Sequence, residues 1–322
     1  MLRRRTLLSA TLALPGAAAL AQAQPFPQRP VRVIIPFAPG GGTDNLARLI
    51  EPLVNRRLGQ NLVIETRPGA GGVIGTEIVA RAEPDGYTVL MTDASFTINP
   101  GLHPRLPFDA EKDFVAVTML ASGSSVLLVH PSLGVRTLQE FLALARARPG
   151  QLSYASGGNG TGPHLAAELV KIQANIELVH VPYRGTGPAT NDVVAGHVPL
   201  MFNGMSAAKP HVEAGRLIAL AVTGEQRNPG LPDVPTFDEQ GLHGIEASSI
   251  WGIYAPARTP EAAVLKLSQS FAGAVTDPAI AQRLEYLGFT PVGSDPATHA
   301  QRVAADIARW RNVIRTAGIR VD

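Results

Sequence analysis

The sequence predicts an α/β protein built of two doubly wound lobes that are joined by a hinge. Strands alternate with helices along the chain, in one series before residue 122 and in a second series after it. In each series a glycine-rich loop joins a strand to a helix, at residues 39–44 and 156–162. Such alternation is typical of a parallel sheet with helices on both faces, so we expect one sheet of this kind in each lobe.

The first series begins with a β-branched run at residues 31–35. Glycines 40–42 follow, and apolar residues from Leu46 to Leu53 then recur at helical spacing. This order predicts a strand, a glycine loop and a helix. The pattern continues with strands expected at 62–64 and 87–91 and with a loop and a helix over 68–78 between them.

The second series follows the small residues at 122–125, which separate two apolar runs and predict the first crossing between the lobes. A helix is expected from Leu138, because Thr137 and Glu140 form a capping-box pattern ahead of an apolar face. A second helix is expected over 165–172, and further strands are expected at 152–155, 177–181, 198–202 and 217–222. The second lobe therefore repeats the architecture of the first.

The chain is predicted to return to the first lobe after a long irregular connection at 223–247, which is rich in proline and glycine. Residues 249–254 are interpreted as the return crossing. Helices are expected from Pro260 and along a final apolar stripe that includes Trp310. The predicted limits are 24–122 plus 251–322 for lobe 1 and 123–250 for lobe 2.

The N-terminus carries a predicted signal peptide over residues 1–23. Three arginines at 3–5 precede an apolar stretch at 7–20, and small residues surround Ala23, after which we expect cleavage. The paired arginines also hint weakly at twin-arginine export. An uncleaved membrane anchor is the alternative, but the apolar stretch is shorter than the roughly 20 residues that span a bilayer. We therefore expect a periplasmic protein.

The composition excludes several classes of function. The chain has 322 residues and no cysteine, which rules out thiol catalysis and cysteine metal sites. It has 28 basic and 26 acidic residues, and removing the three arginines of the signal peptide leaves 25 and 26. The mature chain therefore has no general basic field, and no nucleic-acid partner is expected.

The two glycine loops predict an anion site. Glycine lets the backbone turn sharply and approach a ligand closely, and the start of the helix that follows presents free N–H groups with a partial positive charge. Tight turns without a ligand are the alternative for either loop alone. A loop in each lobe, at the same place in the same strand-loop-helix pattern, favours a ligand held between the lobes.

Patterns for cofactors and catalysis are incomplete. The loops lack the lysine spacing of a P-loop, and residues 69–75 miss G-x-G-x-x-G because Ile74 occupies the position of the third glycine. The segment around Ser206 lacks the second glycine of a nucleophile elbow. The histidines include no H-E-x-x-H, and His164 beside a glycine loop favours capping or packing over catalysis. We therefore expect no catalytic residues, no metal and no cofactor.

Five motifs in order resemble those of the Bug family of tripartite tricarboxylate transporter receptors, and the resemblance extends over essentially the whole mature chain. They lie at residues 33–44 (VIIPFAPGGGTD), 67–72 (RPGAGG), 85–88 (DGYT), 181–185 (VPYRG) and 232–236 (PDVPT). Thr66 and Pro199 depart from the asparagine and aspartate usual in that family, which leaves the details of specificity open.

The resemblance implies the fold of a type II periplasmic binding protein, with a ligand carboxylate held in the cleft by backbone groups and bridging waters from both lobes. The matching positions form the expected ligand site: Phe37, Gly40, Gly41, Gly42, Thr43 and Asp44 in lobe 1, with Ser156, Gly157, Gly158, Asn159, Gly160, Thr161, His164, Tyr183 and Asn203 in lobe 2.

The function implied is capture of a small carboxylate, which could be a dicarboxylate, an amino acid or an aromatic acid. A monomeric receptor would deliver it to the integral membrane permease subunits of a tripartite transporter. A secreted hydrolase using the cleft and a ligand sensor for a membrane receptor kinase are the alternatives. A catalytic set of residues would favour the hydrolase, whereas a sensor would use the same closure and the same ligand site.

Overall fold

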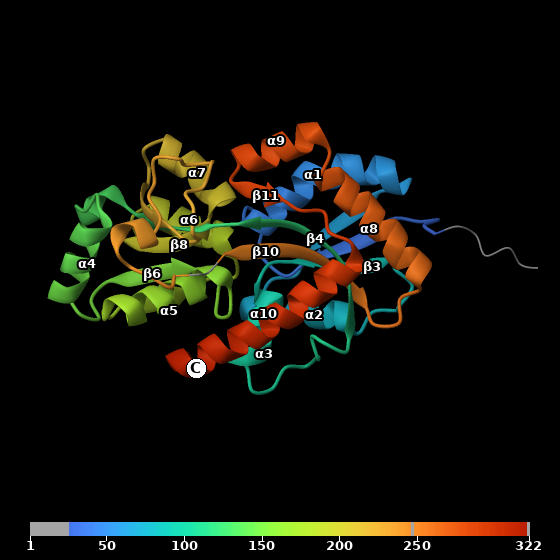
Figure 1. The fold of residues 1–322 in the computed structure, drawn as a ribbon, viewed down its shortest axis with the longest axis horizontal. Coiled ribbons are helices and arrows are strands. Elements are labelled where there is room, and N and C mark those ends of the chain that lie inside the picture. The colour runs from blue at the N-terminus through green and yellow to red at the C-terminus, as the bar shows by residue number, and fades with distance from the viewer. Residues whose placement is uncertain (1–25, 246–247, 321–322) are drawn as a thin grey trace, which may run out of the picture.

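The computed structural model describes residues 26–245 and 248–320, and the predicted signal peptide lies outside them. The described residues form two lobes, each built around its own sheet (Figure 1). No helix in these two ranges is long and apolar enough to cross a membrane.

Lobe 1 contains a six-stranded sheet with the strand order β11-β4-β10-β3-β1-β2. Its strands are β1 (Val31–Ile35), β2 (Leu62–Thr66), β3 (Thr88–Thr92), β4 (Phe114–Gly123), β10 (Ser249–Pro256) and β11 (Phe289–Pro291). Its helices are α1 (Gly42–Leu58), α2 (Val73–Ala80), α3 (Ser95–Leu102), α8 (Glu261–Val275), α9 (Pro278–Tyr286) and α10 (Pro296–Ala317), and a short 3-10 helix, η1 (Ala70–Gly72), precedes α2.

The alternation of side chains along β1 divides the core of lobe 1 into two layers. Val33 and Ile35 pack in one cluster with residues of α1 and α8, whereas Ile34 packs in another with residues of α2, α3 and α10. Successive residues of a strand point to opposite faces of the sheet, so a fully apolar strand needs helices on both sides. Figure 1 shows α1 and α8 on one side of this sheet and α2, α3 and α10 on the other.

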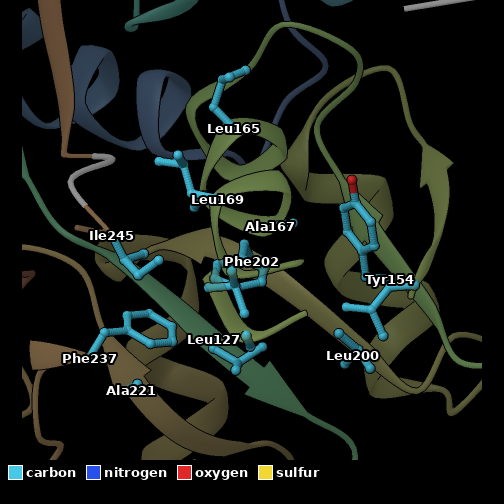
Figure 2. Packing of buried hydrophobic residues seen from close by; sticks show 14 of the residues in the cluster. Leu127, Tyr154, Leu165, Ala167, Leu169, Leu200, Phe202, Ala221, Phe237 and Ile245 are labelled. Atoms are coloured by element: carbon cyan, nitrogen blue, oxygen red, sulfur yellow. The ribbon is translucent and has the colours of Figure 1, made fainter. Parts of the chain in front are cut away.

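Lobe 2 contains a five-stranded sheet with the order β7-β6-β8-β5-β9. Its strands are β5 (Ser125–Val129), β6 (Ser153–Ser156), β7 (Val179–Pro182), β8 (Leu200–Gly204) and β9 (Ile218–Val222). Its helices are α4 (Leu138–Ala147), α5 (Gly162–Ala174), α6 (Thr186–Val194) and α7 (Met205–Glu213), with short 3-10 helices η2 (Pro131–Leu133) and η3 (Asp238–Gln240). Figure 2 shows one layer of its core, where Leu127 and Phe202 of the sheet meet Leu169 of α5.

Both sheets are mixed, which corrects the expectation of two parallel sheets. Strands β1, β2 and β3 are parallel, as are β6, β7 and β8. In contrast, β10 is antiparallel to β3 and β4, and β5 is antiparallel to β8 and β9. The chain enters lobe 2 along β5 and re-enters lobe 1 along β10. These two strands therefore run away from the gap between the lobes. The parallel strands lead toward it.

The crossing between the sheets is short. Strand β4 ends at Gly123 and β5 begins at Ser125, so Ser124 alone separates an element of one sheet from an element of the other. On the return, Ser249 of β10 pairs with Gly123. The predicted lobe limits, at 122/123 and 250/251, lie beside these changes of sheet, and we keep them as a proposal.

Helix α10 extends from lobe 1 toward α5 of lobe 2 (Figure 1). Its Trp310 and Ile314, and Ile319 beyond its end, belong to the same buried cluster as the lobe 2 residues Phe141 and Leu165. Complete burial of one large apolar side chain contributes roughly 1.5–3 kcal/mol to folding. The C-terminal segment therefore attaches lobe 2 to lobe 1 at a distance in sequence from the crossing strands.

Candidate ligand-binding site

A cavity lies between the lobes, where strands of both sheets end. Phe37 follows β1, Asp93 follows β3, Gly157 follows β6 and Gly204 ends β8, and all four line the cavity. Open α/β sheets bind ligands in this position, outside the carboxyl ends of their parallel strands. The complete lining is Phe37, Ala38, Gly41, Gly42, Thr43, Asp44, Asp93, Gly157, Thr161, Pro163, Thr186, Gly204, Ser249 and Trp251.

The cavity is small because the lobes are closed around it. The cavity has a volume of about 30 Å³, which is room for about two water molecules. The backbone N–H of Ala38 in lobe 1 donates a hydrogen bond to the carbonyl of Arg184 in lobe 2 at 2.9 Å, and Gly71 lies against the carbonyl of Asn159 so closely that a Cβ there would collide with it. A larger ligand therefore reaches the cavity only when the lobes move apart.

Four helices begin at the cavity, and none of them has a side-chain cap. The lining residues Gly41, Thr161 and Gly204 are the N-caps of α1, α5 and α7, and Thr186 is the first residue of α6. The first N–H groups of a helix have no partner within it, and they carry part of its positive dipole. One helix start from lobe 1, that of α1, and three from lobe 2, those of α5, α6 and α7, would thus direct N–H groups toward one anion.

The ionisable groups of the lining are both carboxylates. Asp44, on the first turn of α1, is neutralised by Arg48 at 3.0 Å and accepts a hydrogen bond from the N–H of Gly40. Asp93 accepts one from the N–H of Ser95 at 2.9 Å, and burial raises its pKa. The lining contains no lysine, arginine or histidine, so attraction for an anion here comes from N–H groups.

Trp251 of β10 forms an apolar wall of the cavity. Its indole N–H donates to the Thr43 hydroxyl at 3.1 Å, which orients the ring and leaves its carbon edge toward the starts of α1 and α7. Phe37, Ala38 and Pro163 complete the apolar part of the lining. The cavity thus combines N–H donors with apolar walls, a composition suited to a small organic acid.

Two buried polar atoms lie close to the wall. Ser206 Oγ and Asn203 Oδ1 have no hydrogen-bond partner among the described residues, and Ser206 packs beside Gly42 of the lining. A buried polar group without a partner is costly, so these atoms are suited to a ligand or a bridging water.

Seven of the residues expected at the site line the cavity: Phe37, Gly41, Gly42, Thr43, Asp44, Gly157 and Thr161. The structure places the other eight nearby but outside the lining. Gly40 borders a neighbouring surface pocket, and Gly158 lies near Gly71 of lobe 1. The Tyr183 hydroxyl donates a hydrogen bond to the Asp192 carboxylate. Asn203 donates its amide to Thr190. Ser156, Asn159, Gly160 and His164 form the back of the lobe 2 loop, described next.

Two histidines hold the back of the loop at 156–162. His180 Nε2 lies 2.6 Å from Ser156 Oγ, and His164 Nδ1 accepts a hydrogen bond from the N–H of Gly160 at 3.3 Å. Burial lowers the pKa of His164 to about 4 and that of His180 to about 3, so both rings are neutral at pH 7. His164 and Asn159 border a separate polar pocket behind the loop, together with Lys171. These side chains support the loop rather than line the cavity.

The cavity also contains residues that the sequence did not single out as a site: Ala38, Asp93, Pro163, Thr186, Gly204, Ser249 and Trp251. Ala38 lies inside the first glycine motif and Pro163 directly follows the second, so proximity in sequence was a usable signal for them. Thr186 is the first residue of α6 and Gly204 is the N-cap of α7, and the apolar stripe of each helix is short and partly made of alanine. No group of histidine and acidic residues in the described part of the chain could hold a metal ion.

The chain matches the model of the family described as "Tripartite tricarboxylate transporter family receptor" over residues 46–319. A UPF0065 protein of a Pseudomonas species is 38% identical over 97% of this chain and 94% of its own length. Protein BugT of Bordetella pertussis is 33% identical over 100% of this chain and 99% of its own length.

Solved structures agree with this assignment. Periplasmic binding protein BugD superposes with a TM-score of 0.89 at 32% identity, covering 92% of this chain and 99% of BugD. A Rhodopseudomonas palustris protein with bound malate, MatC, gives a TM-score of 0.86 at 34% identity, covering 90% of this chain and 100% of MatC. An R. palustris protein with adipate gives 0.88 at 35% identity, covering 92% of this chain and 99% of that protein.

These likenesses confirm the predicted two-lobed α/β fold and the predicted family. They also agree with the expectation that the chain is not an enzyme, since the named neighbours are binding proteins. The chain belongs to the tripartite tricarboxylate transporter receptor family, whose members are periplasmic solute-binding proteins.

Proposed function

We propose that this protein captures a small carboxylate between its lobes and delivers it to the permease subunits of a tripartite transporter. The observation that carries the proposal is the meeting of four uncapped helix starts at a cavity that contains no basic side chain. Backbone N–H groups at helix starts bind carboxylates without a cationic residue. Malate and adipate in two structural neighbours support this class of ligand.

The ligand site comprises the expected cavity residues from Phe37 to Asp44, with Gly157 and Thr161, and adds Thr186, Gly204 and Trp251. The remaining expected residues, such as His164 and Tyr183, act by shaping the loops. The mature chain is exported after removal of residues 1–23, works in the periplasm and is a monomer. It needs no cofactor, and its partners are the carboxylate and the permease.

A thermal-shift screen of the ligand-free mature protein against a library of small carboxylates tests the binding step. A ligand that binds only the folded state raises the melting temperature. At a free ligand concentration of a hundred times Kd, it adds about 2.7 kcal/mol to the free energy of unfolding. Mass spectrometry after prolonged incubation should recover the ligand unchanged. Failure of every carboxylate to shift the melting temperature would overturn the proposal, and turnover of the ligand would favour the secreted hydrolase.

Delivery is tested separately in cells that carry the permease. Uptake of the identified carboxylate should require both this protein and the permease, and size-exclusion chromatography should show a monomer with and without ligand. Uptake that is unchanged without this protein, together with a ligand-dependent kinase response, would favour the sensor.

A further inference from the structure

The two carboxylates that line the cavity differ in their partners. Asp44 lies beside Arg48, which balances its charge. Asp93, at the end of β3, has Ser95 as its hydrogen-bonding neighbour and forms no ion pair within the described residues. The phenol of Tyr254 also interacts electrostatically with Asp93, but it is neutral at pH 7 because burial raises its pKa. The cavity therefore contains one carboxylate without a cation.

This arrangement is unfavourable on its own. Taking a carboxylate out of water without a cation costs free energy, and the raised pKa of Asp93 reflects that cost. A ligand that presents only carboxylates to this cavity would add like charge beside Asp93. A ligand that also presents a cation would place opposite charges together, and its carboxylate would still meet the helix starts.

We propose that Asp93 selects, among small carboxylates, those that also carry an ammonium group. The inference rests on the proposed function, since it places the ligand carboxylate at the starts of α1, α5, α6 and α7 and the ammonium at the Asp93 carboxylate. An amino acid has both groups on neighbouring atoms, so one small ligand could meet both the helix starts and Asp93, which line the same cavity. Asp93 is then a specificity-determining residue, and the anion site alone accounts for general carboxylate binding.

Matched pairs of ligands separate the two parts of this account. Each pair has one carbon skeleton with and without the amino group: L-aspartate and succinate, L-glutamate and glutarate, L-alanine and propionate, L-phenylalanine and 3-phenylpropionate. Isothermal titration calorimetry on protein freed of bound ligand by unfolding and refolding should give at least one amino acid that binds about tenfold or more tightly than its partner. L-malate, whose hydroxyl is a neutral donor, should lie between aspartate and succinate if that pair binds.

The variant Asp93→Asn keeps the shape of the side chain and removes its charge. We expect it to lose at least about tenfold in affinity for the preferred amino acid and to retain or improve its affinity for the partner without the amino group. Asp233→Asn, at an exposed position outside the cavity lining, is the matched control and should change neither value. Thermal unfolding of both variants verifies that the fold is retained.

The outcomes are distinct. If simple carboxylates bind the unmodified protein as tightly as the amino acids, or if Asp93→Asn leaves the preference unchanged, the role of Asp93 is refuted while the proposed function stands. A neutral, protonated Asp93 that donates to a second ligand carboxylate would give this result, with a dicarboxylate preferred. If no member of any pair binds and the wider carboxylate screen is also negative, the proposed function itself fails.

Discussion

Three of the helices that begin away from the cavity have a side-chain cap, and the four that begin at the cavity have none. Helix α8, which also begins away from the cavity, starts after Pro260 without such a cap. Helices α4, α9 and α10 begin away from the cavity, and each is capped by a side chain, Thr137, Asp277 or Asp295. At the cavity, α1, α6 and α7 have glycine in the same place. At the start of α5 the Thr161 hydroxyl donates to the Gly158 carbonyl and accepts no helix N–H. A side-chain cap contributes about 1 kcal/mol relative to alanine and roughly a few tenths of a kcal/mol relative to glycine. The cavity therefore forgoes stability at positions where its N–H groups can bind a ligand.

The largest effect is expected from a side chain added to the glycine loops. In Gly41→Val the new Cβ would lie 2.7 Å from Thr186 Oγ1, and in Gly158→Val it would lie 2.9 Å from the Tyr183 carbonyl at a φ of +121°. Each variant should lose at least about tenfold in carboxylate affinity, equivalent to roughly 1.4 kcal/mol, and should no longer close on its ligand. Calorimetry measures the first effect and small-angle scattering the second.

Comparison of the two variants tests whether both lobes hold the ligand. If one variant keeps full affinity and closure while the other loses both, the ligand lies on a single lobe. Trp251 in the cavity wall offers an independent fluorescence signal for closure.

A cap added at the cavity should weaken binding without weakening the fold. Gly204 has an extended backbone, with φ −67° and ψ 144°, and the nearest atom to an added Cβ is 3.9 Å away. Gly204→Asp should cap α7 and slightly raise the free energy of unfolding, yet its carboxylate would compete with the ligand for the same N–H groups. We expect a loss of about tenfold in affinity. Gly204→Asn, which caps without charge, should lose less; equal affinity in all three proteins would show that α7 does not contribute.

Removal of a side-chain cap from a helix outside the cavity should lower stability and leave carboxylate affinity nearly unchanged. Thr137→Ala and Asp295→Ala should each lower the free energy of unfolding by about 1 kcal/mol, because the N–H groups of Glu140 and Thr298 lose their partners. Denaturant titration measures this change. Carboxylate affinity should stay within about twofold of the unmodified protein, and a loss as large as that of Gly204→Asp would erase the distinction between the two sets of helix starts.

Two histidines that support the loop at 156–162 make the free energy of unfolding dependent on pH. His164 and His180 have folded-state pKa values of about 4 and about 3, below the unfolded value of 6.5. Between pH 6.5 and about 4 the unfolded chain therefore binds more protons, and stability falls as pH falls, by at most about 1.4 kcal/mol per pH unit for each histidine. Urea unfolding at pH 7 and pH 5 should show this decline, with a shallower slope in His180→Asn. Identical slopes would mean that His180 is not held neutral.

The sequence predicted the cavity-lining residues of the lobe 1 loop more accurately than those of the lobe 2 loop. Five consecutive predicted residues from Gly40 to Asp44 include four that line the cavity, because a helix start follows that motif directly. In lobe 2 the loop is longer and turns back, so Gly158 faces the other lobe and His164 packs behind the loop. Nearness in sequence could not distinguish the side of the loop that each residue occupies.

The helices missed from the sequence explain the missed site residues. Helix α6 begins with Thr186 and includes Pro188, and α7 includes Pro210. The apolar stripe that each buries is short and partly made of alanine, with Ala189 and Val193 in α6 and Met205 and Ala208 in α7. Asp93 and Trp251 come from strands of one sheet that are distant in sequence and adjacent only through the antiparallel pairing of β3 with β10. That pairing depends on the direction in which the chain re-enters lobe 1. The spacing of apolar residues in the sequence does not show this direction.

Salt should have the smallest effect. The lining holds its anion with N–H groups in a closed cavity and without basic side chains, and screening acts weakly on charges shielded from solvent. Carboxylate affinity should change by less than about threefold between 50 mM and 500 mM salt, far less than for a site built from exposed lysines. A steep decline would indicate a cationic surface site instead.

The most direct test of the cavity account is the structure of the protein with the carboxylate identified by screening. We expect the ligand carboxylate oxygens within hydrogen-bond distance of backbone N–H groups at the start of α1 in lobe 1 and at the start of at least one of α5, α6 and α7 in lobe 2. A carboxylate bound by side-chain cations outside this cavity, or contacting N–H groups of one lobe only, would contradict it.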